Sequence, residues 1–122
     1  MKIRRITHDF SICKIYDTSV IDLSDEFCFF SKTDEEMSLV CTTDHVPDDT
    51  IDCDHGWRAF RIDETLDFSL IGILSRISSI LADRGIGMFA ISTFNTDYIL
   101  TRKNDFENAL SALASEGYEI VG

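Results

Sequence analysis

Apolar and polar residues alternate in short runs through the first part of the chain, which predicts β-strands there. The runs at residues 10–15, 27–31 and 37–42 are rich in aromatic and β-branched residues and are bounded by polar clusters. A polar turn at residues 33–36 separates the last two runs, so we expect them to pair as a hairpin. The segment between the first two runs is too polar and too short for more than one or two helical turns.

The pattern then changes to an alternation of strands and helices. Residues 57–62 (WRAFRI) alternate apolar with basic side chains, as in a half-buried strand. From Leu70 to Leu81 apolar residues recur at three- and four-residue steps, which is typical of an amphipathic helix. Asp67 or Ser69 can cap the start of this helix, and Gly85 can end it in a left-handed conformation.

The remaining residues predict a hairpin, a second helix and a last strand. Strands at residues 88–94 and 97–102 flank Asn95 and Thr96, as in a tight turn. Asn104 and Glu107 have the spacing of a capping box for a helix that Gly117 would end, and residues 118–121 form the last strand.

The order strand, helix, strand, strand, helix, strand predicts an α+β fold of the ferredoxin-like βαββαβ type, an antiparallel sheet with helices on one face. We assign this unit to residues 56–122. Residues 1–55 have the strands of the same plan without room for full helices, so we expect a degenerate unit there. The Asp-rich stretch at residues 43–55, with the only proline, is the expected connection. A metal-binding loop is the alternative interpretation, because the stretch contains several Asp and His residues. Their spacing, however, matches no known metal-binding motif.

Composition limits the classes of partner. The 22 Asp and Glu residues against 11 Lys and Arg give a formal charge of −11, which repels phosphate backbones and anionic membranes. We therefore expect neither nucleic acid nor a membrane as partner. No apolar run is long enough to cross a bilayer and MKIRRITHDF does not resemble a signal peptide, so we expect a cytoplasmic protein.

The four cysteines form no CxxC pair, and three lie in apolar, strand-like runs. Buried free thiols fit this pattern best, and a zinc site or disulfide framework is the alternative. The three histidines fall in segments expected to be irregular, and no common catalytic motif occurs. We predict no enzyme activity, no cofactor and no metal.

A binding site for a small zwitterion is better supported. Backbone N–H groups at the helix opening, at residues 68–71, together with the Ser69 hydroxyl, suit a carboxylate. Asp97 on the hairpin suits an ammonium group, although it can equally cap the turn. Gly72 in the first helical turn is explained either by close packing or by close approach of a ligand. Phe94 fits a core position or a pocket wall.

The run DFSLIGILSRISSILADRGIGMFAISTFNTDYIL, preceded by EEMSLVC and GWRAFRI, resembles the ACT domain family, in particular the small tandem-ACT proteins that bind amino acids and include arginine sensors. The resemblance covers most of the chain, and ISTFNTDYIL is its most specific part. It implies a ligand held on one side by Asp67, Phe68, Ser69 and Leu70, and on the other by Thr93, Phe94, Thr96 and Asp97, with Asp97 on the ammonium group.

One departure from the arginine-sensing pattern changes the expected ligand. Ser69 and Leu70 stand where acidic residues are expected just inside the helix opening, so a guanidinium would lack its counter-charge. We therefore expect a smaller neutral or apolar amino acid, with Leu70 and Leu74 near its side chain. The resemblance implies a non-enzymatic regulatory protein, a homodimer that binds its ligand at an interface between ACT units. The alternative is a structural or protein-interaction module without a ligand.

Overall fold

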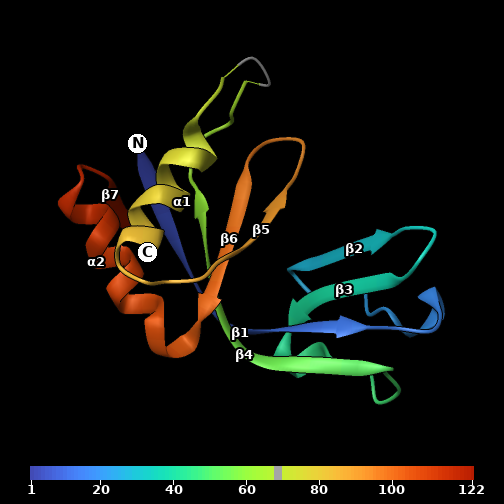
Figure 1. Cartoon of the computed structure of the whole chain (residues 1–122). Coiled ribbons are helices and arrows are strands. Elements are labelled where there is room, and N and C mark those ends of the chain that lie inside the picture. Colours follow the sequence, from blue (N-terminus) through green and yellow to red (C-terminus); the bar gives the residue numbers. More distant parts are fainter. Residues whose placement is uncertain (68–69) are drawn as a thin grey trace. The chain divides into compact units, whose positions relative to one another are not determined.

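The computed structural model describes residues 1–67 and 70–122 (Figure 1). Its strands and helices, in chain order, are β1 (Lys2–Lys14), β2 (Cys28–Lys32), β3 (Met37–Thr42), β4 (Asp52–Ile62), α1 (Ile73–Asp83), β5 (Phe89–Ser92), β6 (Asp97–Arg102), α2 (Phe106–Ser115) and β7 (Glu119–Val121). Short 3-10 turns lie at Thr18–Val20, Thr43–His45 and Lys103–Asp105. The chain forms two compact units: unit 1 contains Met1–Thr7 and Arg58–Gly122, and unit 2 contains His8–Trp57. The predicted domain boundary at residues 55 and 56 stays a prediction.

In unit 2 the strands follow the order β2, β3, β1, β4. The expected hairpin of β2 and β3 is confirmed, and β3 also pairs antiparallel with β1. Two strands are longer than predicted, because β1 begins at Lys2 and β4 at Asp52. His8 and His55 therefore lie in strands, which corrects the expectation of irregular segments. Pairing with neighbouring strands holds these polar stretches in the sheet, although their sequences show no regular alternation.

The expectation of four free thiols is wrong for one pair. Cys13 of β1 and Cys53 of β4 form a disulfide, while Cys28 and Cys41 are free. The two bonded residues are 40 positions apart, and they meet because β1 and β4 are neighbours in the sheet. Since residues 43–55 have the composition of a loop, the local pattern around Cys53 does not indicate this contact.

Unit 1 has the element order β4, α1, β5, β6, α2, β7, and β1 supplies one more strand. Its strand order is β7, β1, β4, β6, β5, so the start of β1 lies between β7 and β4. β5 and β6 pair antiparallel, whereas β7 runs parallel to β1, with Ile3 opposite Ile120. The result is an α+β fold of the ferredoxin-like kind.

Both helices pack on the same face of the strands of unit 1 (Figure 1). Side chains of α1 and α2 join strand residues in one core cluster, which comprises Ile3, Phe60, Ile62, Ile77, Leu81, Ile86, Ile99, Phe106, Ala109, Leu110 and Leu113. Burying each large apolar side chain contributes roughly 1.5–3 kcal/mol, so this cluster is the main source of stability in unit 1. Within residues 1–67 and 70–122, neither α1 nor α2 has the length and apolarity of a membrane-spanning helix.

The predicted helix ends are correct and the predicted helix starts are wrong. Gly85 and Gly117 follow α1 and α2 in the left-handed conformation, at φ +70° and +97°. Asn104 lies in a 3-10 turn, α2 has no side-chain cap, and Glu107 instead pairs with Arg5. The capping box therefore does not form. At α1 the helix begins at Ile73 and its N-cap residue is Gly72, so Asp67 is not its cap, and Ser69 lies outside the described residues.

An ion-pair group ties the N-terminal strand to the end of β4. Arg4 Nε lies 3.0 Å from Asp63 Oδ2, Arg61 Nε lies 3.4 Å from Asp63 Oδ1, and the Asp63 amide donates to the Lys2 carbonyl. Partial burial acts to raise the pKa of Asp63, but the two guanidinium groups outweigh it and lower that pKa.

Candidate functional site

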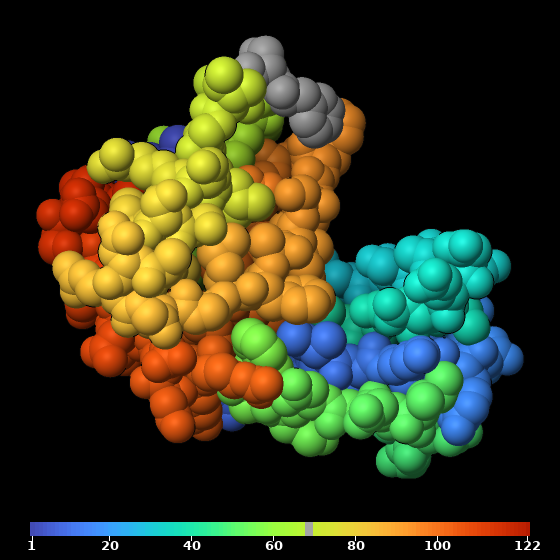
Figure 2. Space-filling view, viewed as in Figure 1, coloured from blue at the N-terminus to red at the C-terminus, as the bar shows by residue number. Residues whose placement is uncertain are grey.

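A cavity of about 300 Å³ in unit 1 lies between the start of α1 and the β5–β6 hairpin. Figure 2 shows the tip of this hairpin (orange) at the surface, near the segment that leads into α1 (yellow-green). The Leu66 amide donates to the Asn95 carbonyl at 2.7 Å, which holds the two walls together. The cavity is lined by Leu66, Asp67, Leu70, Gly72, Ile73, Leu74, Ser75, Ser92, Thr93, Phe94, Asn95, Thr96 and Asp97.

The helix wall of the cavity is the first turn of α1. An α-helix leaves its first N–H groups without intrahelical acceptors, and here these belong to Ile73, Leu74 and Ser75. The sequence pattern places the anion-binding amides at residues 68–71, but the Leu70 amide already donates to the Asp67 carbonyl at 3.0 Å. The positive end of the helix dipole therefore lies a few residues later than expected, still inside the cavity.

The backbone conformation of Gly72 accounts for the glycine, whereas the expected close approach of a ligand stays a prediction. Its φ is +81°, in the left-handed region that glycine adopts without strain. A Cβ at this position would meet nothing within 4 Å, so close packing does not explain the glycine. The residue turns the chain from the preceding loop into α1, and this turn places the first helical amides at the cavity.

The hairpin wall is fixed by its own hydrogen bonds. Ser92 and Asp97 are opposite each other in the β5–β6 register, and the Ser92 hydroxyl donates to Asp97 Oδ1 at 2.6 Å. The turn is closed by threonines, because Thr93 donates from its amide and its hydroxyl to the Thr96 carbonyl. The Thr96 hydroxyl donates to the Ile62 carbonyl at 2.7 Å, which anchors the turn to the end of β4.

The cavity combines negative side chains with the positive end of a helix. Asp67 and Asp97 are the charged side chains among its described lining residues, and both are negative. The opening of α1 supplies partial positive charge and N–H donors. Leu70, Leu74 and Phe94 add an apolar surface. This arrangement can hold a small molecule that carries an ammonium group, a carboxylate and a short apolar part.

Most of the residues predicted for the site come together in this cavity. Of the predicted site residues, seven line it: Asp67, Leu70, Leu74, Thr93, Phe94, Thr96 and Asp97. Phe68 and Ser69 lie outside the described residues. Whether any of the nine binds a ligand stays a prediction. The lining residues not predicted as ligand contacts include Ile73, Ser75 and Ser92. The predicted two-residue turn would pair Asp97 with Phe94, whereas β5 ends at Ser92 and the observed register pairs Asp97 with Ser92.

A second cavity, of about 360 Å³, shares Gly72 and Ile73 with the first. It is lined by Met1, Ile71, Gly72, Ile73, Arg76, Glu116, Gly117 and Tyr118. Its charged side chains, Arg76 and Glu116, lie 3.9 Å apart and compensate each other. The first cavity is lined by two carboxylates and by no basic side chain among the described residues, so it is the stronger candidate for a charged ligand.

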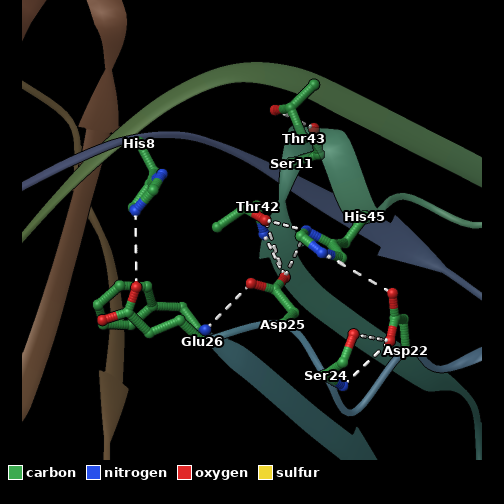
Figure 3. A network of polar contacts seen from close by, with 10 residues as sticks. His8, Ser11, Asp22, Ser24, Asp25, Glu26, Thr42, Thr43 and His45 are labelled. Atoms are coloured by element: carbon green, nitrogen blue, oxygen red, sulfur yellow. Dashed lines mark hydrogen bonds and ion pairs between the residues drawn. The ribbon is translucent and has the colours of Figure 1, made fainter.

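Unit 2 contains a polar network centred on the buried Asp25 (Figure 3). Its carboxylate accepts from the Thr42 amide at 3.0 Å, the Thr42 hydroxyl at 2.9 Å and the Phe27 amide at 3.1 Å. His45 Nδ1 lies 2.8 Å from the Thr42 hydroxyl, and His45 Nε2 lies 3.8 Å from Asp22 Oδ2. These contacts hold the chain before β2 against the end of β3, which is a structural role.

Neither a Ser–His pair nor the Asp-rich stretch forms a catalytic or metal centre in the described part of the chain. Ser11 Oγ lies 2.7 Å from His55 Nδ1 and 2.9 Å from Thr43 Oγ1, but Ser11 is fully buried and out of reach of a substrate. No group of three or more His, Cys, Asp or Glu residues among residues 1–67 and 70–122 is placed to hold a metal ion. The absence of enzyme activity stays a prediction.

Several solved structures are similar to this chain. Protein Atu0741 from Agobacterium tumefaciens is 31% identical with a TM-score of 0.86, and the match covers 98% of this chain and 91% of that one. Protein VC0802 from Vibrio cholerae, described as a protein of unknown function and possible transport protein, is 18% identical with a TM-score of 0.73, over 92% and 86% of the two chains.

An aspartate kinase, described as an allosteric enzyme, shares the fold as well. The enzyme from Clostridium acetobutylicum is 12% identical with a TM-score of 0.69, and the match covers 92% of this chain but 32% of the kinase. No curated protein matches the chain. The model of the ACT domain family matches residues 52–115, which include the helix opening, the hairpin and both helices. Since this match covers more than half of the sequence, the chain belongs to the ACT domain family.

Proposed function

We propose that this protein is a non-enzymatic regulatory module that binds an amino acid in the first cavity, at an interface between ACT units in tandem. The observation that carries the proposal is that one cavity combines carboxylates with the positive end of the α1 dipole. ACT domains are commonly regulatory modules that bind amino acids, which agrees with this geometry.

In the proposed complex the ligand lies across the cavity from helix to hairpin. Its carboxylate accepts from the amides of Ile73, Leu74 and Ser75, and its ammonium group pairs with Asp97, which the Ser92 hydroxyl holds in place. Asp67 adds a second negative charge to the cavity. A ligand with an acidic side chain would face two carboxylates, so we expect a neutral or apolar amino acid.

The cavity is small and open, which supports a role for a second ACT unit in closing it. A volume of about 300 Å³ is at the lower end for ligand pockets. Leu70 is 53% exposed and Phe94 81% exposed at the cavity, and the adjacent Ile71 is 92% exposed. In the proposal these side chains contact a second copy of the chain, and the ligand stabilises the dimer by its higher affinity for the closed arrangement.

Thermal-shift measurements against the twenty amino acids test the proposal. A ligand present at 100 times its Kd stabilises the folded state by about 2.7 kcal/mol, which is a clear shift in Tm. We expect one or a few neutral amino acids to produce this shift, and Asp97→Asn to remove it. Asp83→Asn is the matched control, because Asp83 is an exposed acid at the end of α1, outside the cavity.

Two results would contradict the proposal. A shift that persists in Asp97→Asn would place the ligand elsewhere. A flat screen, combined with self-association that depends on protein concentration, would support the alternative of a structural or protein-interaction module without a ligand.

A further inference from the structure

All four cysteines lie in unit 2 and gather on one face of its sheet. The β2–β3 register places Cys28 opposite Cys41, and the β1–β3 register places Cys13 opposite Leu39, the second residue before Cys41. Because side chains alternate between faces along a strand, Cys13, Cys28 and Cys41 point to the same side. They share one apolar cluster with Cys53.

The two sulfurs of the Cys13–Cys53 disulfide differ in access and surroundings. Cys13 is 3% exposed, whereas Cys53 is half-buried, so an external thiol reaches Cys53 first. His55 Nδ1 lies 4.0 Å from Cys53 Sγ and 2.7 Å from the hydroxyl of the buried Ser11. Ser11 thus holds an exposed imidazole beside the accessible sulfur.

The other two cysteines are poor partners for exchange. Burial raises the pKa of the Cys41 thiol to about 12, and burial together with Asp25 raises the pKa of Cys28. Since the thiolate is the nucleophile in thiol–disulfide exchange, the raised pKa values disfavour attack by either thiol on the disulfide at neutral pH. A thiol from outside the chain is therefore the favoured reactant at Cys53.

We propose that the Cys13–Cys53 disulfide is a thiol–disulfide exchange site, which a dithiol reductant opens by attack on Cys53 in the folded protein. In the first step a reductant thiolate bonds to Cys53 Sγ, the S–S bond breaks, and its electron pair leaves on the Cys13 sulfur, which takes a proton from water. In the second step the other thiolate of the reductant attacks its own sulfur in the mixed disulfide. This closes the reductant's disulfide and releases Cys53 as a thiolate, which accepts a hydrogen bond from the Nδ1–H tautomer of His55 and then takes a proton from water.

The reaction transfers two electrons and two protons from the dithiol to the cysteines. Its structural result is the loss of the covalent link between β1 and β4. These are the strands that run from unit 2 into unit 1, since β1 begins at Lys2 and β4 ends at Ile62. Reduction of the disulfide therefore removes a covalent restraint on both strands.

The test is reduction of the folded, full-length protein by dithiothreitol, followed by an acid quench and thiol counting by mass spectrometry after alkylation in denaturant. We expect two alkylated cysteines before reduction and four after it, while the fluorescence of Trp57, the only tryptophan, stays that of the folded state. Cys28→Ser is the matched control and removes one thiol from both counts without changing the rate of reduction.

His55→Ala separates an exchange site from an ordinary disulfide. In the first step Cys13 is the leaving sulfur, so His55 acts on the second step, in which Cys53 leaves. Loss of its hydrogen bond slows that step, so we expect the acid quench to trap about three- to tenfold more mixed disulfide between dithiothreitol and Cys53. The proposal is overturned by any of three results: four free thiols in air-oxidised protein, a disulfide that dithiothreitol reduces only once urea has unfolded the chain, or an unchanged amount of trapped mixed disulfide in His55→Ala.

Discussion

The polar network of unit 2 leads to a direct stability prediction for Asp25→Ala. The Asp25 side chain is 2% exposed, and its carboxylate accepts three hydrogen bonds from the chain before β2 and from the end of β3. Removing it deprives the Phe27 and Thr42 amides of this acceptor in a place that water reaches poorly. The Thr42 hydroxyl keeps its contact with His45.

The magnitude follows from the two amides. An unsatisfied buried donor costs about 1–3 kcal/mol, which applies in full to the Thr42 amide, and the partly buried Phe27 amide adds less, so the pair costs about 2–4 kcal/mol. Part of this is recovered because a buried carboxylate is no longer desolvated. We expect Asp25→Ala to lower the free energy of unfolding by about 3 kcal/mol, which is a decrease in Tm of roughly 10 °C for a chain of this size. Asp25→Asn retains one acceptor oxygen, so its free energy of unfolding should lie between those of Asp25→Ala and the natural protein.

Urea unfolding followed by Trp57 fluorescence is the assay, because Trp57 belongs to unit 2. Asp22→Ala is the matched control. Asp22 accepts from the Ser24 amide and hydroxyl in a local turn, but its side chain is 47% exposed, so water replaces the carboxylate and we expect only a small loss of stability. Equal losses in Asp22→Ala and Asp25→Ala would refute the reasoning.

Three further predictions concern unit 1. Gly72→Ala places a residue with a Cβ in the left-handed region and should lower the free energy of unfolding by about 1–2 kcal/mol, measured by thermal unfolding. Gly87→Ala, where φ is not positive, should lower it much less. Similar losses at both glycines would argue against a role for φ. Leu81→Ala removes a fully buried side chain from α1 and should destabilise by about 2–5 kcal/mol in chemical unfolding, against little change in the exposed Ser79→Ala. The lowered pKa of Asp63 stabilises the folded state above the unfolded-state pKa near 3.8, and this contribution is lost as the pH falls through the lower folded-state value. Asp63→Asn should therefore be less stable than the natural protein at pH 7 and approach it near pH 2, and a difference independent of pH would contradict the linkage.

The elements of the fold that depend on local pattern were predictable from the sequence. The helical periodicity of residues 70–81 and the terminal glycines Gly85 and Gly117 indicate α1 and the ends of both helices. The strands β3 and β6 agree with the prediction residue for residue. In each case the determining interaction lies within one segment, and apolar periodicity or the left-handed preference of glycine reports it directly.

The same holds for the two walls of the candidate site, which come from one continuous stretch of sequence. Asp97, Thr93 and Leu70 were predictable as neighbours, because the helix opening and the hairpin follow each other along the chain. The exact start of α1 was not predictable, since the positive φ of Gly72 places it at Ile73 and the sequence offers several polar residues as alternative caps.

Only the tertiary structure decided the features that join distant residues. The start of β1 lies between β7 and β4, Cys13 meets Cys53, and Asp25 caps the end of β3. Each contact depends on which strands become neighbours, and that choice is made by burial of side chains from the whole chain, as for Ile3 in the core of unit 1. The sequence by itself determined the local conformations, whereas strand order, the disulfide and the buried polar network followed from packing, because no single segment contains both partners of these interactions.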